Sequence, residues 1–409
     1  ANAFSGCNTL ETVRMLSGVR TISANAFYGA SGLTEVEIPN TVTEIGANAF
    51  YDCASLTEIV IPNSVTSIGH SAFRGCNSLV KMTLPFVGES RESTAYNAVF
   101  GYIFGYQTVK TSYDASTVLS TKFVNEKYGN YNDAIWQYTC RNNQYTSSYC
   151  GNQSYWYYIP SSLQEVVITD ASIASDAAFN GCTMLTSITL NEGITAINGY
   201  AFYNCTGLTE MVIPESVTSI GTYAFAESGN LAEVTLPSGL TAISDYTFQN
   251  CVSLTNVNGN GEVIIGANVT SIGTSAFGGC TSITKVTLPT GLTEIGGSAF
   301  SGATSLTQIN IPASVTSIGA SAFSNCGNLI RINSETDGKV ILQEGLTSIG
   351  SFAFRNLGKI TEVVVPDSVT SIGQGAFQGC NSLVKMTLPF VGGSRSTTTS
   401  TPSTASSSW

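Results

Sequence analysis

Apolar and polar positions recur along this chain in one fixed pattern, L-x-x-I-x-I-P-x-x-V-T-x-I-G-x-x-A-F-x-x-C. Residues 57–79 follow it closely, and residues 209–231 and 307–329 repeat those with few changes. Such self-similarity is typical of stacked architectures, because one copy cannot bury its apolar faces without its neighbours. The pattern therefore predicts a repeat solenoid.

One phenylalanine, usually preceded by alanine, occurs once in each copy and sets the period. Successive markers lie 23 residues apart at nine steps, and the other steps are 29, 31 and 106 residues. We therefore expect thirteen copies with two small insertions and one large one. The markers are Phe4, Phe27, Phe50, Phe73, Phe179, Phe202, Phe225, Phe248, Phe277, Phe300, Phe323, Phe354 and Phe377.

The first part of each copy has the spacing of a half-buried strand. Leu56, Ile59 and Ile61 fit a period of two, which places their side chains on one face. Pro62 follows and ends the strand, because proline has no N–H for a ladder. Stacked copies would place these strands side by side, about 4.8 Å apart.

The second part of each copy turns back toward the same core. Val65 and Ile68 place a second extended segment inward, and Gly69 allows the next corner. We expect one helical turn to begin at the alanine–phenylalanine pair. It would direct Phe73 into the interior, with Cys76 facing the same core.

The L-x-x-I-x-I strand pattern resembles a leucine-rich repeat. The following I-P, V-T-x-I-G and A-F-x-x-C motifs resemble the BspA-like family of bacterial surface proteins, over residues 1–85 and 163–392. The resemblance implies a mainly β, right-handed superhelix with parallel strands on its concave face. It also implies a non-enzymatic cell-surface or secreted adhesion module that binds host or neighbouring-cell proteins.

An aromatic-rich insertion interrupts the repeats and contains 12 of the 18 tyrosines. After the last copy, the Ser/Thr-rich tail has the composition of a flexible linker. The predicted division is repeats at 1–85, the insertion at 86–160, repeats at 161–392 and the tail at 393–409.

Two copies are longer than the others. One contains an Asn-Gly pair at Asn258 and the other an Asp-Gly pair at Asp337, and each pair precedes an apolar strand. Both dipeptides favour tight hairpins. We therefore expect a small hairpin excursion in each copy, with the regular pattern resuming at Val269 and Leu346.

The net charge of −11 limits the classes of partner. The insertion holds five basic and five acidic residues, so the negative charge lies on the repeats. An acidic array disfavours nucleic acid and anionic membranes, and no apolar run approaches the roughly 20 residues of a membrane helix. The chain begins within a copy and without methionine, so we expect a fragment of a longer protein.

Nine of the eleven cysteines follow a marker phenylalanine by three residues. Ala30, Ser228 and Leu357 occupy the same place in other copies, which favours a packing position filled by buried free thiols. A ladder of disulfides between successive copies is the alternative. Cys140 and Cys150 lie in the insertion, and the sequence leaves open whether they pair.

Two surfaces are candidates for binding. Outward positions of the strands form two columns, the usual binding surface of a solenoid, although a merely solvated sheet face has the same pattern. Three interpretations of the aromatic residues in the insertion stay open: an internal core, a protein contact or a carbohydrate site. Residues 155–158 are the best candidate for an exposed patch. The candidate residues are Glu35, Glu37, Glu58, Glu165, Glu210, Glu233, Trp136, Tyr155, Trp156, Tyr157 and Tyr158.

No arrangement of residues indicates an enzyme, a cofactor or a metal site. The single histidine, His70, occupies a variable place after Gly69, where we expect a solvent-exposed side chain. S-x-x-K occurs at Ser78, but its lysine is simply an outward strand position. The sequence therefore favours a protein-binding adhesion module without catalysis or cofactor, with a carbohydrate-binding surface protein as the alternative.

Overall fold

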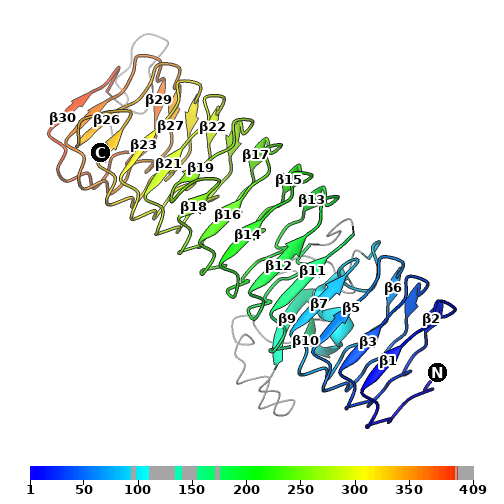
Figure 1. Ribbon diagram of the computed structural model, residues 1–409. Helices are drawn as coiled ribbons and strands as arrows, with labels where there is room; N and C mark the ends of the chain where they lie inside the picture. Colours follow the sequence, from blue (N-terminus) through cyan, green and yellow to red (C-terminus); the bar gives the residue numbers. More distant parts are fainter. Residues whose placement is uncertain (94–97, 110–133, 141–153, 171–175, 392–393, 395–409) are drawn as a thin grey trace. The chain divides into compact units, whose positions relative to one another are not determined.

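The computed structural model describes residues 1–93, 98–109, 134–140, 154–170, 176–391 and 394. These belong to two compact units, Ala1–Leu208 and Thr209–Trp409, and each unit is a stack of copies (Figure 1). In each unit the copies contribute strands to a parallel sheet, here called the strand face, and shorter strands to a second sheet. The predicted solenoid of parallel strands is confirmed in both units.

In the first unit, β1 pairs with β3, and β5, β7, β11 and β12 form one parallel sheet in that order. The strands of this strand face are β1 (Thr12–Arg14), β3 (Glu35–Glu37), β5 (Glu58–Val60), β7 (Lys81–Leu84), β11 (Glu165–Ile168) and β12 (Ser187–Leu190). The short strands are β2 (Thr21–Ile22), β4 (Glu44–Ile45), β6 (Ser67–Ile68) and β13 (Ala196–Ile197).

In the second unit, one ten-stranded parallel sheet forms the strand face. Its strands, in order, are β14 (Glu210–Val212), β16 (Glu233–Thr235), β18 (Asn256–Val257), β19 (Val263–Ile264), β21 (Lys285–Thr287), β23 (Gln308–Asn310), β25 (Arg331–Ile332), β26 (Lys339–Ile341), β28 (Glu362–Val364) and β30 (Lys385–Thr387). The short strands are β15 (Ser219–Ile220), β17 (Ala242–Ile243), β20 (Ser271–Ile272), β22 (Glu294–Ile295), β24 (Ser317–Ile318), β27 (Ser348–Ile349) and β29 (Ser371–Ile372).

The predicted alternation along the strands is confirmed. Leu56, Ile59 and Ile61 are at most 1% exposed, while Glu58 and Val60 between them face solvent. Because neighbouring copies pair in register, each apolar position becomes a continuous buried column and each outward position a continuous surface column. This register fixes the geometry of the strand face.

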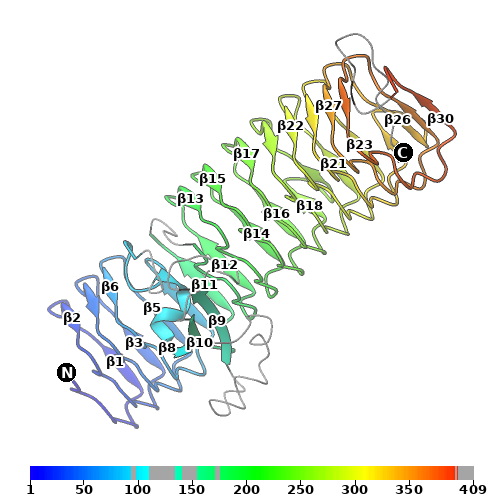
Figure 2. The same cartoon turned by 180° about the vertical axis from the view of Figure 1, so that it is seen from behind.

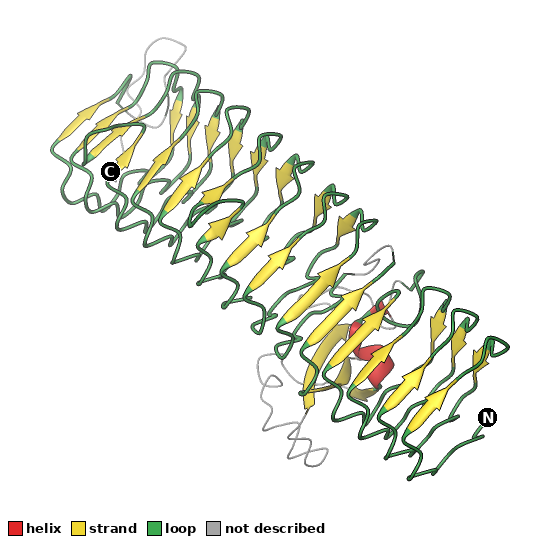
Figure 3. Ribbon diagram, viewed as in Figure 1, coloured by secondary structure: helices red, strands yellow, loops and turns green. Residues whose placement is uncertain are grey.

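The expected helical turn at the alanine–phenylalanine pair is wrong, and the segment is a turn of another kind (Figure 3). The residue two places before the marker has a positive φ, 59° at Ser71, which ends any helical hydrogen-bonding pattern. The freed N–H groups bond to the next copy instead, as Phe50 N–H does to the Ala72 carbonyl at 2.8 Å. Each copy is thereby tied to its neighbour by a further backbone ladder.

The marker phenylalanines form a continuous stack in the second unit. In the first unit they stack from Phe4 to Phe73 and from Phe179 to Phe202, and Phe100 of the insertion lies 5.1 Å from Phe179. Phe277 and Phe300 have ring centroids 5.4 Å apart and planes inclined by 2°. The stack also passes through the two longer copies, since Phe248 lies 5.4 Å from Phe277 and Phe323 lies 5.6 Å from Phe354. The extra residues of those copies therefore leave the interior undisturbed.

The glycine that follows most of the short strands serves close packing. Gly69 has an ordinary backbone conformation, but a Cβ built on it would lie 2.3 Å from the Ala47 nitrogen. The expectation that the corner requires glycine for its backbone conformation is therefore wrong at Gly69, where close packing requires it instead. Ser244 occupies this place in another copy, where its hydroxyl donates to the Ile220 carbonyl.

The cysteine column consists of free thiols, as expected, and no disulfide ladder forms among the nine described cysteines. Seven of these thiols donate to the marker carbonyl of the preceding copy, as Cys251 Sγ does to the Phe225 oxygen at 3.1 Å. Burial raises the pKa of Cys205 to about 12. Cys7, in the first copy, is exposed. Pairing of Cys140 with Cys150 lies outside the described residues.

These thiols should differ sharply in reactivity. At pH 8 we expect iodoacetamide to modify Cys7 within minutes, and to modify Cys205 and Cys251 roughly a thousandfold more slowly. The reason is that the thiolate is the nucleophile, and burial suppresses both its formation and its access. Peptide-level mass spectrometry measures each rate, with a sample in 8 M urea as the fully reactive control. Equal rates for Cys7 and Cys251 in the folded protein would contradict the packing.

The two longer copies do not form the expected hairpins. Each adds a second parallel strand to the strand face, β19 beside β18 and β26 beside β25. Asn258 and Asn333 leave the first strand with φ of 55° and 50°, and the chain loops back to start the second strand in the same direction. The regular pattern does resume at Val269 and Leu346, both buried. The strand face of the second unit thus gains two strands, one in each longer copy.

The large insertion leaves the strand face unbroken, because β7 and β11 pair directly with Lys81 opposite Glu165. A 3₁₀ helix, η2 (Phe100–Phe104), takes the place of the alanine–phenylalanine turn in this copy. Phe73 N–H donates to the Ile103 carbonyl and Phe100 N–H to the Ala178 carbonyl, each at 2.9 Å. This part of the insertion is therefore built into the core.

The rest of the described insertion is a small antiparallel sheet in the order β8–β10–β9, and both views place it at the level of β7 and β11 (Figures 1 and 2). Its strands are β8 (Tyr106–Val109), β9 (Ala134–Cys140) and β10 (Ser154–Pro160). Tyr157 and Ile159 of β10 are fully buried. The predicted division into four segments stays a prediction, and nearly all of the predicted linker tail lies outside the described residues.

Candidate functional site

All six candidate glutamates lie at outward positions of the strand face. Within the first unit, several are neutralised by basic neighbours. Glu37 lies 2.8 Å from Arg14 on the adjacent strand, and Glu165 lies 2.7 Å from Lys81. The hydrogen bond that Lys81 donates to Glu165 raises the pKa of Lys81. Glu35 and Glu58 are exposed on β3 and β5.

In the second unit, Glu210 on β14 lies directly opposite Glu233 on β16. Both side chains are exposed, and neither makes an ion pair with any residue that the structure describes. Like charges placed directly opposite one another on a sheet are destabilising. Val212, at the next outward position of β14, is 66% exposed, so an apolar group adjoins the acidic pair.

Farther along the same sheet, the outward charges compensate each other. Lys285 lies 2.6 Å from Glu262, and Glu362 lies 3.0 Å from Lys385 and 3.5 Å from Lys339. The hydrogen bond from Lys385 is the main cause of the lowered pKa of Glu362. The pair Glu210 and Glu233 is therefore the part of this sheet whose charge is not balanced locally.

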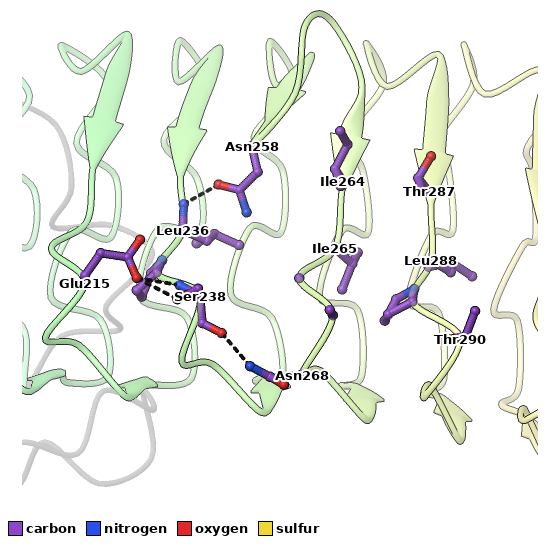
Figure 4. Close-up of a pocket in the computed structure, with 14 residues that line it drawn as sticks. Glu215, Leu236, Ser238, Asn258, Ile264, Ile265, Asn268, Thr287, Leu288 and Thr290 are labelled. Carbon is purple, nitrogen blue, oxygen red and sulfur yellow. Dashed lines mark hydrogen bonds between the residues drawn. The ribbon is translucent and has the colours of Figure 1, made fainter.

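A cavity of about 480 Å³ opens in the second unit where the first extra strand is inserted (Figure 4). It lies at the ends of the strands, between the corner after β16 and the corner after β21. The residues around it are Glu215, Leu236, Pro237, Ser238, Asn258, Ile264, Ile265, Gly266, Ala267, Asn268, Thr287, Leu288, Pro289 and Thr290. None of these is aromatic.

Polar side chains bridge the walls of this cavity (Figure 4). Asn258 Oδ1 accepts from Leu236 N–H at 2.7 Å, and Asn268 Nδ2 donates to the Ser238 carbonyl at 3.0 Å. The Glu215 carboxylate accepts from the Ser238 N–H and hydroxyl at 2.9 and 2.8 Å. These bonds lower the pKa of Glu215, which therefore carries a negative charge at the rim at neutral pH.

The sequence did not predict this cavity, although it contained a signal. Most regular copies place an apolar residue and proline at the corner, as in Leu236-Pro237 and Leu288-Pro289, and Leu190-Asn191 is an exception. The two longer copies have lost the proline, and Gly266 and Gln343 take its place.

Among the aromatic candidates of the insertion, the structure describes the side chains of Tyr157 and Tyr158. Tyr157 is fully buried, so an exposed patch over residues 155–158 is wrong at that position. Tyr158 is half-buried, and its hydroxyl donates to Asn77 Oδ1 at 3.2 Å. In the backbone register, Trp136 lies opposite Tyr158. The side chains of Trp136, Tyr155 and Trp156 lie outside the described residues.

His70 is half-buried rather than exposed, because the insertion covers it. Its Nδ1 lies 2.9 Å from Ser71 Oγ, and its ring meets the edge of Tyr102 at 5.5 Å. Burial, followed by the nearby charge of Arg74, lowers the pKa of His70. Ser71 is only 2% exposed, so its hydroxyl has no access to a substrate. The pair therefore belongs to the packing of the insertion.

Within the described residues, no three histidine, cysteine or acidic side chains converge on a point where a metal ion would bind. No helix in the same residues combines the length and apolar character needed to cross a membrane.

Comparison with models of known protein families identifies the family of this chain. The BspA type leucine-rich repeat region, in six copies, matches residues 1–125, 152–264, 260–383 and 333–397. The chain belongs to the BspA-type leucine-rich repeat family. The L-x-x-I-x-I, V-T-x-I-G and A-F-x-x-C motifs of this BspA-type protein are thus family features. A search of curated protein sequences finds no match.

Solved structures similar to this BspA-type chain include three bacterial leucine-rich repeat proteins. A leucine-rich cell surface protein of Faecalibacterium prausnitzii is 23% identical over 90% of this chain and 82% of its own, with a TM-score of 0.40. A Bacteroides ovatus protein is 22% identical over 93% and 82%, with a TM-score of 0.39. A T. pallidum protein is 25% identical over 54% and 78%, with a TM-score of 0.36.

Proposed function

We propose that this BspA-type protein is a non-enzymatic adhesion module, cell-surface or secreted, that binds proteins of a host or of neighbouring cells. Leucine-rich repeats of this kind are typically scaffolds for protein interaction, and the family membership carries that general role. The single observation that locates the proposal is the pair Glu210 and Glu233, adjacent in register and without a cationic partner among the described residues.

The acidic pair is complementary in charge to a basic segment of a partner protein. Two opposed carboxylates cost stability in the free protein, and a basic segment of a partner would relieve that repulsion on binding. Val212 beside them offers exposed apolar surface, and such surface commonly anchors interfaces. The partner that fits is a protein with a basic segment flanked by apolar side chains.

A binding experiment tests this proposal. The full chain is immobilised and screened by biolayer interferometry against purified extracellular-matrix proteins and surface proteins of neighbouring bacteria. We expect Glu210→Gln/Glu233→Gln to weaken the tightest interaction about tenfold, and 0.5 M NaCl to weaken it further, because exposed charge pairs are screened by salt.

The matched control is Glu294→Gln/Glu335→Gln, which removes the same charge from exposed positions of the same unit that lie off the two outward columns. This variant should bind like the original chain. Equal binding by the Glu210/Glu233 variant would contradict the proposed surface, and a screen without any protein partner would contradict the proposed function.

A second candidate is carbohydrate binding by the insertion, favoured by the opposition of Trp136 and Tyr158 in the β9–β10 register. Aromatic rings stack on sugar rings and supply both an apolar face and a polar edge. On a glycan array, this candidate requires a signal that Trp156→Ala removes. An array without signal would contradict it.

A further inference from the structure

We propose that the cavity beside β19 binds an extended segment of a partner protein with an apolar residue followed by proline. This rests on the proposed protein-binding function and names a ligand class and a place for it. The cavity is the space that one strand-to-corner segment would fill if β18 continued like its neighbours.

The cavity arises because this copy contributes two strands to the sheet but only one corner. β18 and β19 both lie in the sheet, but only β19 runs on into a corner, at Ile265 and Gly266. Adjacent strands lie about 4.8 Å apart, so Leu236 and Ile265 are separated by about twice that distance. A gap of this width accepts one extended chain.

The Asn258 side chain accepts a hydrogen bond that a main-chain carbonyl accepts in regular copies. In regular copies the N–H before the proline bonds to the next strand, as Ile213 N–H does to the Thr235 carbonyl at 3.0 Å. By register, the equivalent acceptor for Leu236 N–H is the Asn258 main-chain carbonyl, but the side-chain Oδ1 of Asn258 accepts the bond instead, at 2.7 Å. This side-chain hydrogen bond satisfies Leu236 N–H in the cavity wall but does not fill the space beside it.

In the second longer copy, the corresponding asparagine bridges both sides of the gap. Asn333 Oδ1 accepts from Ile311 N–H at 2.6 Å, and its Nδ2 donates to the Ile341 carbonyl at 2.9 Å. Asn258 makes only the first of these two bonds, so among the described residues its Nδ2 has no acceptor. Asn258 therefore offers a hydrogen-bond donor in the open copy.

Gly266 adds a second donor. It occupies the place that proline holds in most corners, so it carries an N–H, and no described residue accepts from it. Leu236, Ile264 and Leu288 supply apolar walls. Two donors between apolar walls fit carbonyl oxygens of an extended chain, and a proline in that chain needs no acceptor because it has no N–H.

The remaining chemistry disfavours other ligands. The Glu215 carboxylate at the rim repels anions and attracts a basic residue beside the apolar–proline pair. No aromatic ring lines the cavity, so the stacking surface that sugar rings prefer is absent from its walls. A peptide with the character of the chain's own corner is the best fit.

Methyl NMR of the full chain, labelled at isoleucine δ1 carbons, tests the inference. The probe is acetyl-KVTLPTG-amide, which copies residues 285–291, and the control probe is acetyl-KVTSGTG-amide. We expect saturable shifts of the Ile264 and Ile265 methyls with the first peptide, and binding at least about tenfold weaker with the second.

Two substitutions and one matched control locate the binding. Gly266→Pro restores the corner residue where a Cβ would meet no atom within 4 Å, and it should weaken binding at least about tenfold. Asn258→Asp keeps the acceptor for Leu236 N–H but loses the donor, and it should weaken binding about threefold to tenfold. The matched control, Gln343→Pro, introduces proline at the same place in the copy that Asn333 bridges, and it should leave peptide binding unchanged. Thermal unfolding confirms that each variant is folded.

Unchanged binding by Gly266→Pro, or shifts confined to isoleucines elsewhere, would overturn the site. A partner protein that binds through Glu210 and Glu233 while the peptide produces no shift would overturn this inference and leave the proposed function intact. Peptide binding at Ile264 without any partner protein in the screen would support this site and contradict the proposed function.

Discussion

Excising residues 108–155 and joining Gln107 to Trp156 through an Asn-Gly turn should leave the first unit folded, whereas replacing residues 87–159 with a Gly/Ser loop should unfold it. Gln107 and Trp156 are already opposite each other in the antiparallel β8–β10 register, so a two-residue turn closes them. The short excision keeps η2 and the buried end of β10.

The longer replacement removes buried side chains on which the stack depends. Phe100, Phe104 and Tyr157 are all fully buried, and truncating one buried aromatic typically costs about 3–5 kcal/mol. Three such losses approach or exceed the whole stability of a domain, roughly 5–15 kcal/mol. The peptide ladder from Phe73 through η2 to Ala178 would be lost as well.

Circular dichroism and urea unfolding of both variants measure the outcome. The short excision should retain the sheet spectrum and lose little of the denaturation midpoint. The long replacement should lose the transition of the first unit. If both variants unfold like the original chain, the insertion is an appendage and its packing role is wrong. The short excision also removes Trp136, so it serves as the folded negative control on the glycan array.

Phe300→Ala should destabilise the second unit by about 3–5 kcal/mol. The ring is fully buried and stacked on both sides, 5.4 Å from Phe277 and 5.6 Å from Phe323. Removing it leaves a cavity in the middle of a one-dimensional stack, where each copy is supported only by its neighbours. Urea denaturation followed by circular dichroism gives the change in midpoint.

The matched control is Phe4→Ala, the same repeat position in the first copy. Phe4 is 49% exposed and stacks on one side only, against Phe27 at 5.3 Å. Its truncation should therefore cost well under half as much. Equal losses at the two positions would show that stacking within the array contributes little, and that local turn structure dominates instead.

The repeat fold was predictable because its information is local and repeated. Leu56, Ile59 and Ile61 specify a buried strand face by spacing alone, and in-register stacking turns that spacing into columns. The burial of Phe73 and Cys76 followed for the same reason. The glutamates were correctly placed on the outward face, since a period of two fixes which side of a strand a residue occupies.

The consequences of pairing were not predictable from local signals. An Asn-Gly pair favours a hairpin, but at Asn258 the ladder with β21 continues in parallel, and an extra strand forms instead. Neutralisation also depends on neighbours: Glu165 meets Lys81 across 84 residues of sequence, while Glu210 meets Glu233. Which glutamates keep an unbalanced charge is therefore a property of the register.

The sequence alone thus determined the solenoid, its period, its buried columns and its family pattern, because each of these is encoded within a single copy. Only the tertiary structure decided that η2 completes the core, that Tyr157 is buried and that a cavity opens at Gly266. Each of these depends on which segment lies beside which, and distant contacts of that kind leave no periodic trace in the sequence.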